Sequence, residues 1–367
     1  MGIWKYADLL PPIAAQHRVS LDEGNTPLVH SRRIGPAAGV KNLYFKLESC
    51  NPTGSYKDRY AASAVSHLLE GDRHAMLGTS SGNAGSALAA YCASVQVPCC
   101  LAIAESAPES KLRQMLAYGA TLIRIHGFGP DPEVSNQVVD GLEALAREIG
   151  AVREISAFCF SPLGMAGVQT IGYELAEQLP EGLEHVFTPS AGGGLTLAVA
   201  RGFERLRREG RSSSAPAIHC VQPEGNNSIA GPLRQGEARA RDCVSTTAIN
   251  GLQVARVADG NETLVACRAS GGTGYLVSDE AVYEVQARLA REEGVFAEPA
   301  GATALAGMLD ACRRGELEAD ARVVCLVTGS GFKDEASIER MLEGRSCPMV
   351  ESFGEFRQAC LEITKEE

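Results

Sequence analysis

Short apolar segments alternate with helical segments along most of this chain, and this alternation limits the possible folds more than any other feature. A parallel pair of strands needs a long crossover between them, usually a helix, so strands that alternate with helices pair mostly in parallel. The sequence therefore predicts an α/β fold with mostly parallel sheets flanked by helices. Strands are expected at 43–49, 74–80, 97–103, 121–125, 184–188, 217–222 and 321–328, and helices at 83–94, 108–120, 133–149, 165–179, 195–209, 278–294 and 300–314.

Charge, hydropathy and cysteine usage exclude several classes of function. The 367 residues include 34 Lys or Arg and 45 Asp or Glu, giving a net charge of −11. This charge repels nucleic acid and anionic membranes, so neither is expected as a partner. No apolar run approaches the roughly 18 residues of a membrane span, and the start "MGIWKYADLLPP" shows no signal-peptide pattern. The twelve cysteines lie mostly in apolar runs without a C-x-x-C, which predicts buried reduced thiols and a cytoplasmic protein.

Three glycine-rich loops follow predicted strands, where α/β proteins bind their ligands. They are "GTSSGNAG" (78–85), "PSAGGGL" (189–195) and "TGSGFKD" (328–334). In the second loop, Gly192, Gly193 and Gly194 would let successive amides converge on an anion at a helix start, which favours a phosphate. The fingerprints G-x-G-x-x-G and G-x-x-x-x-G-K-[ST] are absent, so a cofactor with a single phosphate fits better than a dinucleotide. A tight turn without a ligand is the alternative.

The first loop has two functional interpretations and one structural one. "GTSSG" (78–82) matches G-x-S-x-G, which would make Ser80 the nucleophile of a serine hydrolase. Alternatively, the loop forms a cup for a carboxylate, with the side chain of Asn83 donating to an aromatic oxygen. The cup would consist of the hydroxyls of Ser80 and Ser81 and the amides of Gly82, Asn83 and Ala84. The third possibility is a purely structural turn.

The segment "NPTGSYKDR" (51–59) places Lys57 near the start of a predicted helix, where a cation is unfavourable. A lysine there is either exposed to solvent, or its amine is neutral or condensed with a carbonyl as a Schiff base. We expect its neighbours Asp58 and Arg59 to be structural. A lysine amine, a phosphate cup and a carboxylate cup are together what pyridoxal phosphate and an amino acid require.

Six segments, in the same order and over nearly the whole chain, resemble the threonine synthase family. This family is part of the tryptophan synthase β-like (fold type II) branch of pyridoxal-phosphate enzymes, which also holds serine and threonine dehydratases. The segments are "EGNTPL" (23–28), "NPTGSYKDR" (51–59), "SSGNAGSALAAYCA" (80–93), "KLRQMLAYGA" (111–120), "EPAGATALAG" (298–307) and "TGSGFKD" (328–334).

The resemblance implies roles for residues of this chain. Lys57 would form the Schiff base with pyridoxal phosphate and later carry protons, Asn83 would face the cofactor's 3′-oxygen, and Thr328 would bind its pyridine nitrogen. No metal ion is expected. The implied cofactor site consists of Lys57, Asn83, Ala191, Gly192, Gly193, Gly194, Leu195 and Thr328, and the substrate carboxylate site of Ser80, Ser81, Gly82, Asn83 and Ala84.

The resemblance also implies the activity and the architecture. We expect a lyase or synthase acting at the β or γ carbon of an amino acid, with conversion of phosphohomoserine to threonine as the first interpretation. A dehydratase or β-replacement enzyme on a non-phosphorylated hydroxy amino acid is the alternative. A large cofactor domain (1–49 and 166–367), a smaller mobile domain (50–165) that closes on the substrate, and a homodimer are expected.

One segment departs from the family pattern. Where the family writes a run such as "NPYRIEGQKT", this chain has "SPLGMAGVQT" (161–170), so Gly164 and Gln169 replace an arginine and a lysine. Losing two charged hydrogen bonds removes roughly 3–6 kcal/mol, or about two to four powers of ten in phosphate affinity. Lys111 and Arg113 could supply substitute cations, or they could be solvated charges on a helix.

Overall fold

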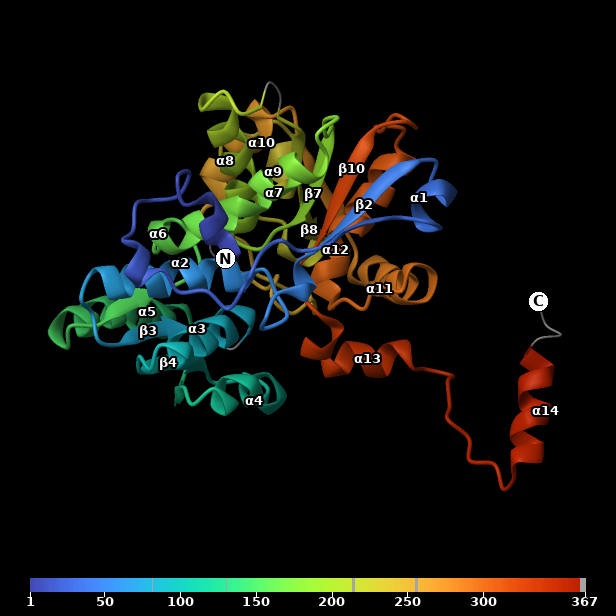
Figure 1. Cartoon of the computed structure of the whole chain (residues 1–367), viewed down its shortest axis with the longest axis horizontal. Coiled ribbons are helices and arrows are strands. Elements are labelled where there is room, and N and C mark those ends of the chain that lie inside the picture. Colours follow the sequence, from blue (N-terminus) through green and yellow to red (C-terminus); the bar gives the residue numbers. More distant parts are fainter. Residues whose placement is uncertain (81, 130, 213–214, 255–256, 364–367) are drawn as a thin grey trace.

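Two sheets, surrounded by helices, organise the part of the chain that the structure describes (Figure 1). The structure is a computed structural model and describes residues 1–80, 82–129, 131–212, 215–254 and 257–363. The larger sheet has six strands in the order β1-β2-β10-β7-β8-β9, and the smaller has four in the order β5-β4-β3-β6. The predicted α/β architecture with mostly parallel sheets is confirmed.

The six-stranded sheet is parallel except where β1 pairs with β2. Helices cover both of its faces, so side chains that alternate along one strand are buried on either side. On β10, Val324 and Leu326 pack with α7 and α8, whereas Val323 and Cys325 pack with α11 and α12. The elements are β1 (Leu28–His30), β2 (Asn42–Leu47), β7 (His185–Pro189), β8 (Ala217–Pro223), β9 (Gly274–Val277), β10 (Arg322–Val327), α7 (Thr170–Gln178), α8 (Gly194–Arg208), α10 (Gly260–Ala269), α11 (Asp279–Glu293) and α12 (Pro299–Arg313).

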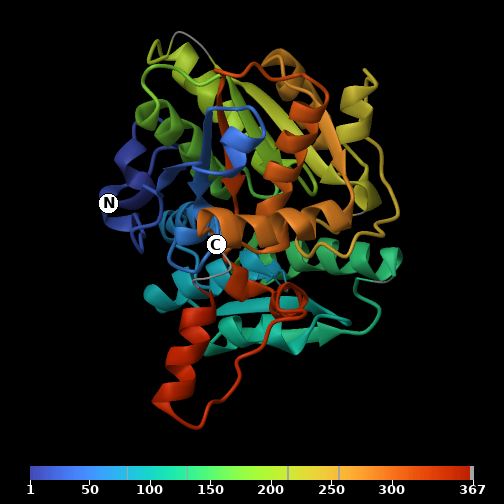
Figure 2. The same cartoon turned by 90° about the vertical axis from the view of Figure 1, so that its right-hand side faces the viewer.

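The four-stranded sheet is entirely parallel and comes from one continuous stretch of chain. Figure 2 shows it below the larger sheet, with its own helices around it. Its strands lie within the segment 50–165 that the sequence assigns to the smaller domain. Its elements are β3 (Met76–Thr79), β4 (Cys99–Ala104), β5 (Thr121–Ile125), β6 (Val152–Glu154), α2 (Lys57–Glu70), α3 (Asn83–Ser94), α4 (Glu109–Ala117) and α5 (Pro132–Glu148).

The predicted helix at 165–179 is wrong in its bounds. The chain instead forms α6 (Pro162–Ala166), a 3₁₀ turn at Gly167–Gln169, and then α7. Gly167 allows this break to lie directly against the backbone of α2, because a Cβ at 167 would be only 2.1 Å from the carbonyl oxygen of Arg59. The sequence patterns also missed α1 (Ile34–Ala37), α9 (Ala230–Arg234), α10, α13 (Glu335–Met341) and α14 (Phe353–Ile363), as well as β1, β6 and β9.

None of the helices in the described residues has the length and apolar character needed to cross a membrane. All twelve cysteines are free thiols, as predicted, but their burial differs from the prediction. Five are buried, whereas Cys50, Cys159, Cys347 and Cys360 are exposed. The last two belong to the C-terminal segment with α14, which stands apart from the body of the molecule in both views (Figures 1 and 2).

Candidate cofactor and substrate site

Lys57 is the first residue of α2 and is half-buried instead of extending into solvent. Its Nζ donates a 2.7 Å hydrogen bond to Oγ of Ser156, in the segment after β6. The same nitrogen lies 4.8 Å from the ring centroid of Tyr56. The amide of Tyr56 donates to the carbonyl of Thr328, directly after β10, at 3.1 Å. Lys57 is therefore held between segments that follow the carboxyl ends of strands from both sheets.

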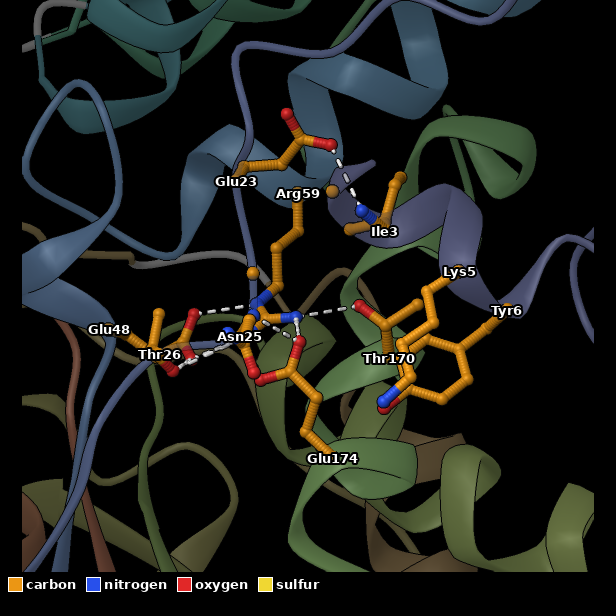
Figure 3. A network of polar contacts seen from close by, with 12 residues as sticks. Ile3, Lys5, Tyr6, Glu23, Asn25, Thr26, Glu48, Arg59, Thr170 and Glu174 are labelled. Carbon is orange, nitrogen blue, oxygen red and sulfur yellow. Dashed lines mark hydrogen bonds and ion pairs between the residues drawn. The ribbon is translucent and has the colours of Figure 1, made fainter. Parts of the chain in front are cut away.

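Arg59 fixes the first turn of α2 through a buried ion-pair network (Figure 3). Its guanidinium donates to Glu48 at 2.8 Å and to Glu174 of α7 at 2.7 Å, and Lys46 of β2 also donates to Glu174 at 2.6 Å. Burial alone would raise the pKa of Glu174, but the charge and hydrogen bonds of Arg59 and Lys46 lower it to about 2. These charges are compensated inside the protein, so the expected structural role of Arg59 is confirmed.

Asp58 also has a structural position. It is fully buried, and its carboxylate accepts hydrogen bonds from the backbone amide of Thr53 at 2.8 Å and from the Thr53 hydroxyl at 2.7 Å. These bonds close the turn that precedes α2. Burial raises the pKa of Asp58 to about 7, because the two hydrogen bonds compensate only part of the lost hydration.

The triple-glycine turn connects β7 to α8 and has the properties of a phosphate cup. Gly193 has φ +103°, and a Cβ there would lie 2.4 Å from Oγ1 of Thr263, so no other residue fits without a shift. The amides of Gly194, Leu195 and Thr196 open α8 and have no acceptor among the described residues. Free amides at the positive end of a helix are the donors that a phosphate group needs. The carbonyl of Ala191 is fixed by a 3.0 Å hydrogen bond from Gln222.

Ser156 lies next to both the lysine and the glycine turn. Its hydroxyl accepts the hydrogen bond from Lys57, and its carbonyl oxygen is 3.7 Å from the point where a Cβ of Gly194 would stand. The amine and the start of α8 are therefore parts of one site, although they lie on helices beside different sheets.

Asn83 is the first residue of α3, in the loop that follows β3. Its side-chain nitrogen Nδ2 donates a 2.8 Å hydrogen bond to Oε1 of Glu298. The side-chain amide has a second hydrogen that can donate to another oxygen. Ser80 accepts from the amide of Gly82 at 3.2 Å, while the amides of Asn83 and Ala84 form the first turn of α3. The predicted cup residue Ser81 lies outside the described residues.

Glu298 joins the Asn83 loop to the loop after β10. The carboxylate is buried over Gly329, where a Cβ would lie 2.1 Å from Oε1, and the Glu298 amide donates to the Gly329 carbonyl at 3.0 Å. Burial raises its pKa to about 7, against the lowering effect of Lys333 and of the Asn83 hydrogen bond. Thr328, next to Gly329, is itself buried.

A cavity of about 510 Å³ adjoins this region and lies between α3, α4 and the loop after β10. Asn83, Glu298, Lys111 and Lys333 are among its lining residues. Sequence reasoning assigned no role to Ser156, Glu298 or Lys333. The last two lie inside the quoted segments "EPAGATALAG" and "TGSGFKD", which was the available signal, whereas no pattern pointed to Ser156.

The structure gives no catalytic base to the serine-hydrolase interpretation of Ser80. His126 pairs with Glu105, and His185 hydrogen-bonds to His219, so the histidines considered for this role have other partners. Among the residues that the structure describes, no histidine contacts Ser80.

The two positions that depart from the family pattern carry no cation into the site. A Cβ on Gly164 would lie 2.8 Å from the ring of Tyr60, so this position packs against α2. The side-chain oxygen of Gln169 accepts a 3.4 Å hydrogen bond from the Tyr173 hydroxyl. Neither residue provides a charged donor.

Comparisons with known proteins agree with the donor set of this site. The model of the pyridoxal-phosphate dependent enzyme family matches residues 19–329. A threonine synthase of Methanocaldococcus jannaschii is 32% identical over 94% of this chain and 83% of its own length. A threonine synthase of a Bacillus species is 33% identical over 90% of this chain and 89% of its own. The solved structure of the processed threonine deaminase isoform 2 of Solanum lycopersicum has a TM-score of 0.74, with 20% identity over 93% of this chain and 92% of that one.

The amides at the start of α8, which have no acceptor among the described residues, fit a phosphate. The half-buried amine of Lys57 fits an aldehyde, and the second side-chain hydrogen of Asn83 fits an oxygen attached to an aromatic ring. Pyridoxal phosphate combines these three groups, so the residues present suit the cofactor that the family uses. The chain belongs to the family of pyridoxal-phosphate dependent enzymes, with the fold type II architecture and pyridoxal phosphate as its cofactor.

Proposed function

We propose that this enzyme is a lyase or synthase that eliminates or replaces a group at the β or γ carbon of an amino acid, with threonine synthase-like conversion of phosphohomoserine as its reaction. The observation that carries the proposal is the position of the Lys57 amine beside the triple-glycine turn, through their shared neighbour Ser156. The threonine synthases at 32% and 33% identity support the choice of substrate.

Each group of residues has one role in this proposal. The amine of Lys57 holds the cofactor's aldehyde carbon and, once the substrate amine has replaced it, takes and returns the substrate's α proton. The amides of 191–195 bind the phosphate of the cofactor, and the amides of 82–84 bind the substrate carboxylate. The side chain of Asn83 donates to the 3′-oxygen of the cofactor, and Glu298 holds this side-chain amide in place. Bound pyridoxal phosphate supplies an electron sink for the carbanion left by proton removal.

The Thr328 hydroxyl is proposed to bind the pyridine nitrogen. A hydroxyl stabilises a protonated pyridine less than a carboxylate does, so the electron sink is milder. A milder sink suits elimination and replacement better than transamination.

A specific observation favours a second candidate. Gly164 and Gln169 lack the cations that the family pattern uses for a phosphorylated substrate, and the ring of Tyr60 occupies the space beside Gly164. An enzyme that acts on threonine, serine or a related hydroxy amino acid needs no such cations. A dehydratase or β-replacement activity is therefore the alternative.

Product analysis separates the two candidates. Holoenzyme is incubated with O-phosphohomoserine, threonine or serine, and inorganic phosphate, threonine and keto acid are measured. Release of phosphate together with threonine supports the synthase. Keto acid from threonine or serine without an added nucleophile supports the dehydratase, and no product from any of these would contradict both.

We also propose the architecture expected from the sequence: a large domain of residues 1–49 and 166–367, a small mobile domain of residues 50–165, and a homodimer in the cytoplasm. Light scattering coupled to size-exclusion chromatography measures the oligomeric state, and a mass of one chain, near 38.7 kDa, would contradict the dimer.

A further inference from the structure

Two lysines line the cavity beside Asn83, and no carboxylate of the described residues lies within 4 Å of their ammonium groups. Lys111 belongs to α4 beside the smaller sheet, and Lys333 follows β10 of the larger sheet. Both side chains are half-buried. Lys333 donates to Oε1 of Gln114 at 2.7 Å, and neither lysine forms an ion pair with a described residue. Half-buried cations are rarely left unpaired, because desolvation is costly unless an opposite charge compensates it.

The surroundings of these lysines supply hydrogen-bond donors. The hydroxyls of Ser86, Ser110 and Ser330 line the same cavity, whereas the side-chain nitrogen of Gln114 already donates to Thr53 and Tyr118. Arg113 lies at the exposed edge, 3.7 Å from Glu335. A phosphate oxygen accepts hydrogen bonds from hydroxyl and ammonium groups such as those that line this cavity. Lysine binds phosphate as a point charge.

Negative groups also face the lysines and have to be counted. The charges that face Glu298 are Lys333, Lys111 and Asp334. Asp58 also faces Lys333, and burial raises the pKa of Asp58 to about 7. Asp334 is already occupied, since it accepts hydrogen bonds from Asn250 and from the amide of Ser337. Glu298 is buried with a pKa raised to about 7, so part of its population is neutral near neutral pH. An anion entering the cavity would favour this neutral form further.

We propose that Lys111 and Lys333 form an anion subsite that receives the phosphate monoester group of the substrate. The inference rests on the proposed function and names the residues that replace the cations missing at 164 and 169. The subsite adjoins Gly82 and Asn83, which are proposed to bind the substrate carboxylate, so one substrate can reach both places. Because one lysine comes from each side of the cleft, the bound anion also favours the closed arrangement of the two sheets.

Sulfate binding to the holoenzyme tests the subsite directly, since bound cofactor already fills the glycine turn. Calorimetric titration is carried out at constant ionic strength with the native enzyme, Lys111→Gln, Lys333→Gln and Lys41→Gln, the last on an exposed lysine. We expect at least about tenfold weaker sulfate binding in the first two variants, from the loss of a charged hydrogen bond, and unchanged binding in Lys41→Gln. Lys111→Arg, which keeps the charge, should retain most of the affinity. Equal affinity in the native enzyme and both lysine variants, or no sulfate binding at all, would overturn the proposal.

The pH dependence adds a readout that a merely structural lysine would not change. Sulfate keeps its charge between pH 6 and pH 8, so a change in its affinity reports on the protein. Glu298 loses its proton over this range, and binding should weaken as the pH rises. Asp58 also faces Lys333 and titrates in this range, so Glu298→Gln should remove part of this decline and Glu298→Gln combined with Asp58→Asn most of it. A native affinity that is independent of pH, or an unaltered decline in Glu298→Gln, would contradict the arrangement.

Kinetics distinguish failure of the subsite from failure of the proposed function. If the native enzyme converts phosphohomoserine and the KM is the same in Lys111→Gln and Lys333→Gln, the function stands and the subsite is wrong. If no phosphohomoserine is converted but sulfate binding depends on both lysines, the subsite stands as an anion site and the substrate is wrong.

Discussion

The ammonium of Lys57 and the hydroxyl of Ser156 lie 2.7 Å apart, although 99 residues separate them in the sequence. This hydrogen bond brings the first residue of α2 to the segment that follows the last strand of the smaller sheet. The carbonyl of the same serine approaches Gly194 at the start of α8. A lysine at a helix start, which is unfavourable for a cation, thus has both a polar partner and a nearby phosphate cup.

Replacing the reactive amine should abolish turnover while leaving the fold intact. In Lys57→Ala we expect activity to fall by at least about 10³-fold, because both the covalent attachment and the proton carrier are lost. Borohydride reduction followed by mass spectrometry should find no cofactor linked to the variant chain. Lys41→Ala, on an exposed lysine paired with Asp320, is the matched control and should behave like the native enzyme. A covalent adduct that survives in Lys57→Ala would contradict the assignment.

Adding bulk to the glycine turn should weaken cofactor retention. The Cβ of a valine at 193 would collide with Oγ1 of Thr263. The valine would also need a backbone φ of +103°, which residues with a side chain rarely adopt. Gly193→Val should therefore lose most of its pyridoxal phosphate on dialysis, measured by the cofactor's visible absorbance per chain. Gly210→Ala separates strain from collision, since that glycine has φ +68° but no atom within 4 Å of a Cβ. Full occupancy in Gly193→Val would mean that the phosphate binds elsewhere.

Removing the central cation of the buried network should destabilise the protein strongly. Arg59→Met leaves Glu48 buried without its cation and Glu174 with Lys46 as its remaining cationic partner, which should lower the free energy of unfolding by about 3–5 kcal/mol. Urea unfolding measures this difference. Arg147→Met breaks an exposed pair with Glu143 and should cost less than about 1 kcal/mol. Equal losses in the two variants would show that the buried network contributes no special stability.

Stability should decrease with rising pH because of Asp58. Its folded pKa of about 7 lies above the ordinary aspartate value of 3.8, so the protonated form is favoured in the folded state. The stabilisation is complete below the unfolded pKa and is lost as the pH rises through about 7, a change on the order of 4 kcal/mol. In Asp58→Asn, which keeps hydrogen-bonding capacity toward Thr53, unfolding free energies measured from pH 5 to pH 8 should decline less. An identical slope in both proteins would show that Asp58 does not titrate in this range.

The sequence predicted the elements with clear periodicity and clear punctuation. The helix at 83–94 and the strand at 121–125 have the predicted bounds, and α2 does begin at Lys57. In each case the signal is local: glycine or proline before the element, and a regular apolar pattern within it. The broken helix at 162–178 escaped prediction because its cause is Gly167 touching the backbone of Arg59, a contact between segments about a hundred residues apart.

The polar partners of the site were the least predictable part. Asn83 was singled out from its loop, but its bond to Glu298 spans 215 residues, and no short pattern encodes such a contact. The same is true of Lys333, whose lack of an ion pair with any described residue depends on which carboxylates the fold brings near it. Sequence patterns proposed the residues that would touch the cofactor, whereas the residues that hold them in place follow from the tertiary structure.

If the proposed small domain moves relative to the larger sheet, the network around Arg59 decides which of the two Lys57 follows. Glu48 follows β2, Glu174 lies on α7, and both belong to the part of the chain around the larger sheet. Separating Arg59 from them would leave Glu48 and Arg59 without their ion-pair partners away from water, so we propose that the start of α2 stays with the larger sheet, although it lies within the proposed domain 50–165. In this proposal the hinge between the sheets lies beyond the first turn of α2, and domain closure would bring the loop of Asn83 toward an amine that stays in place.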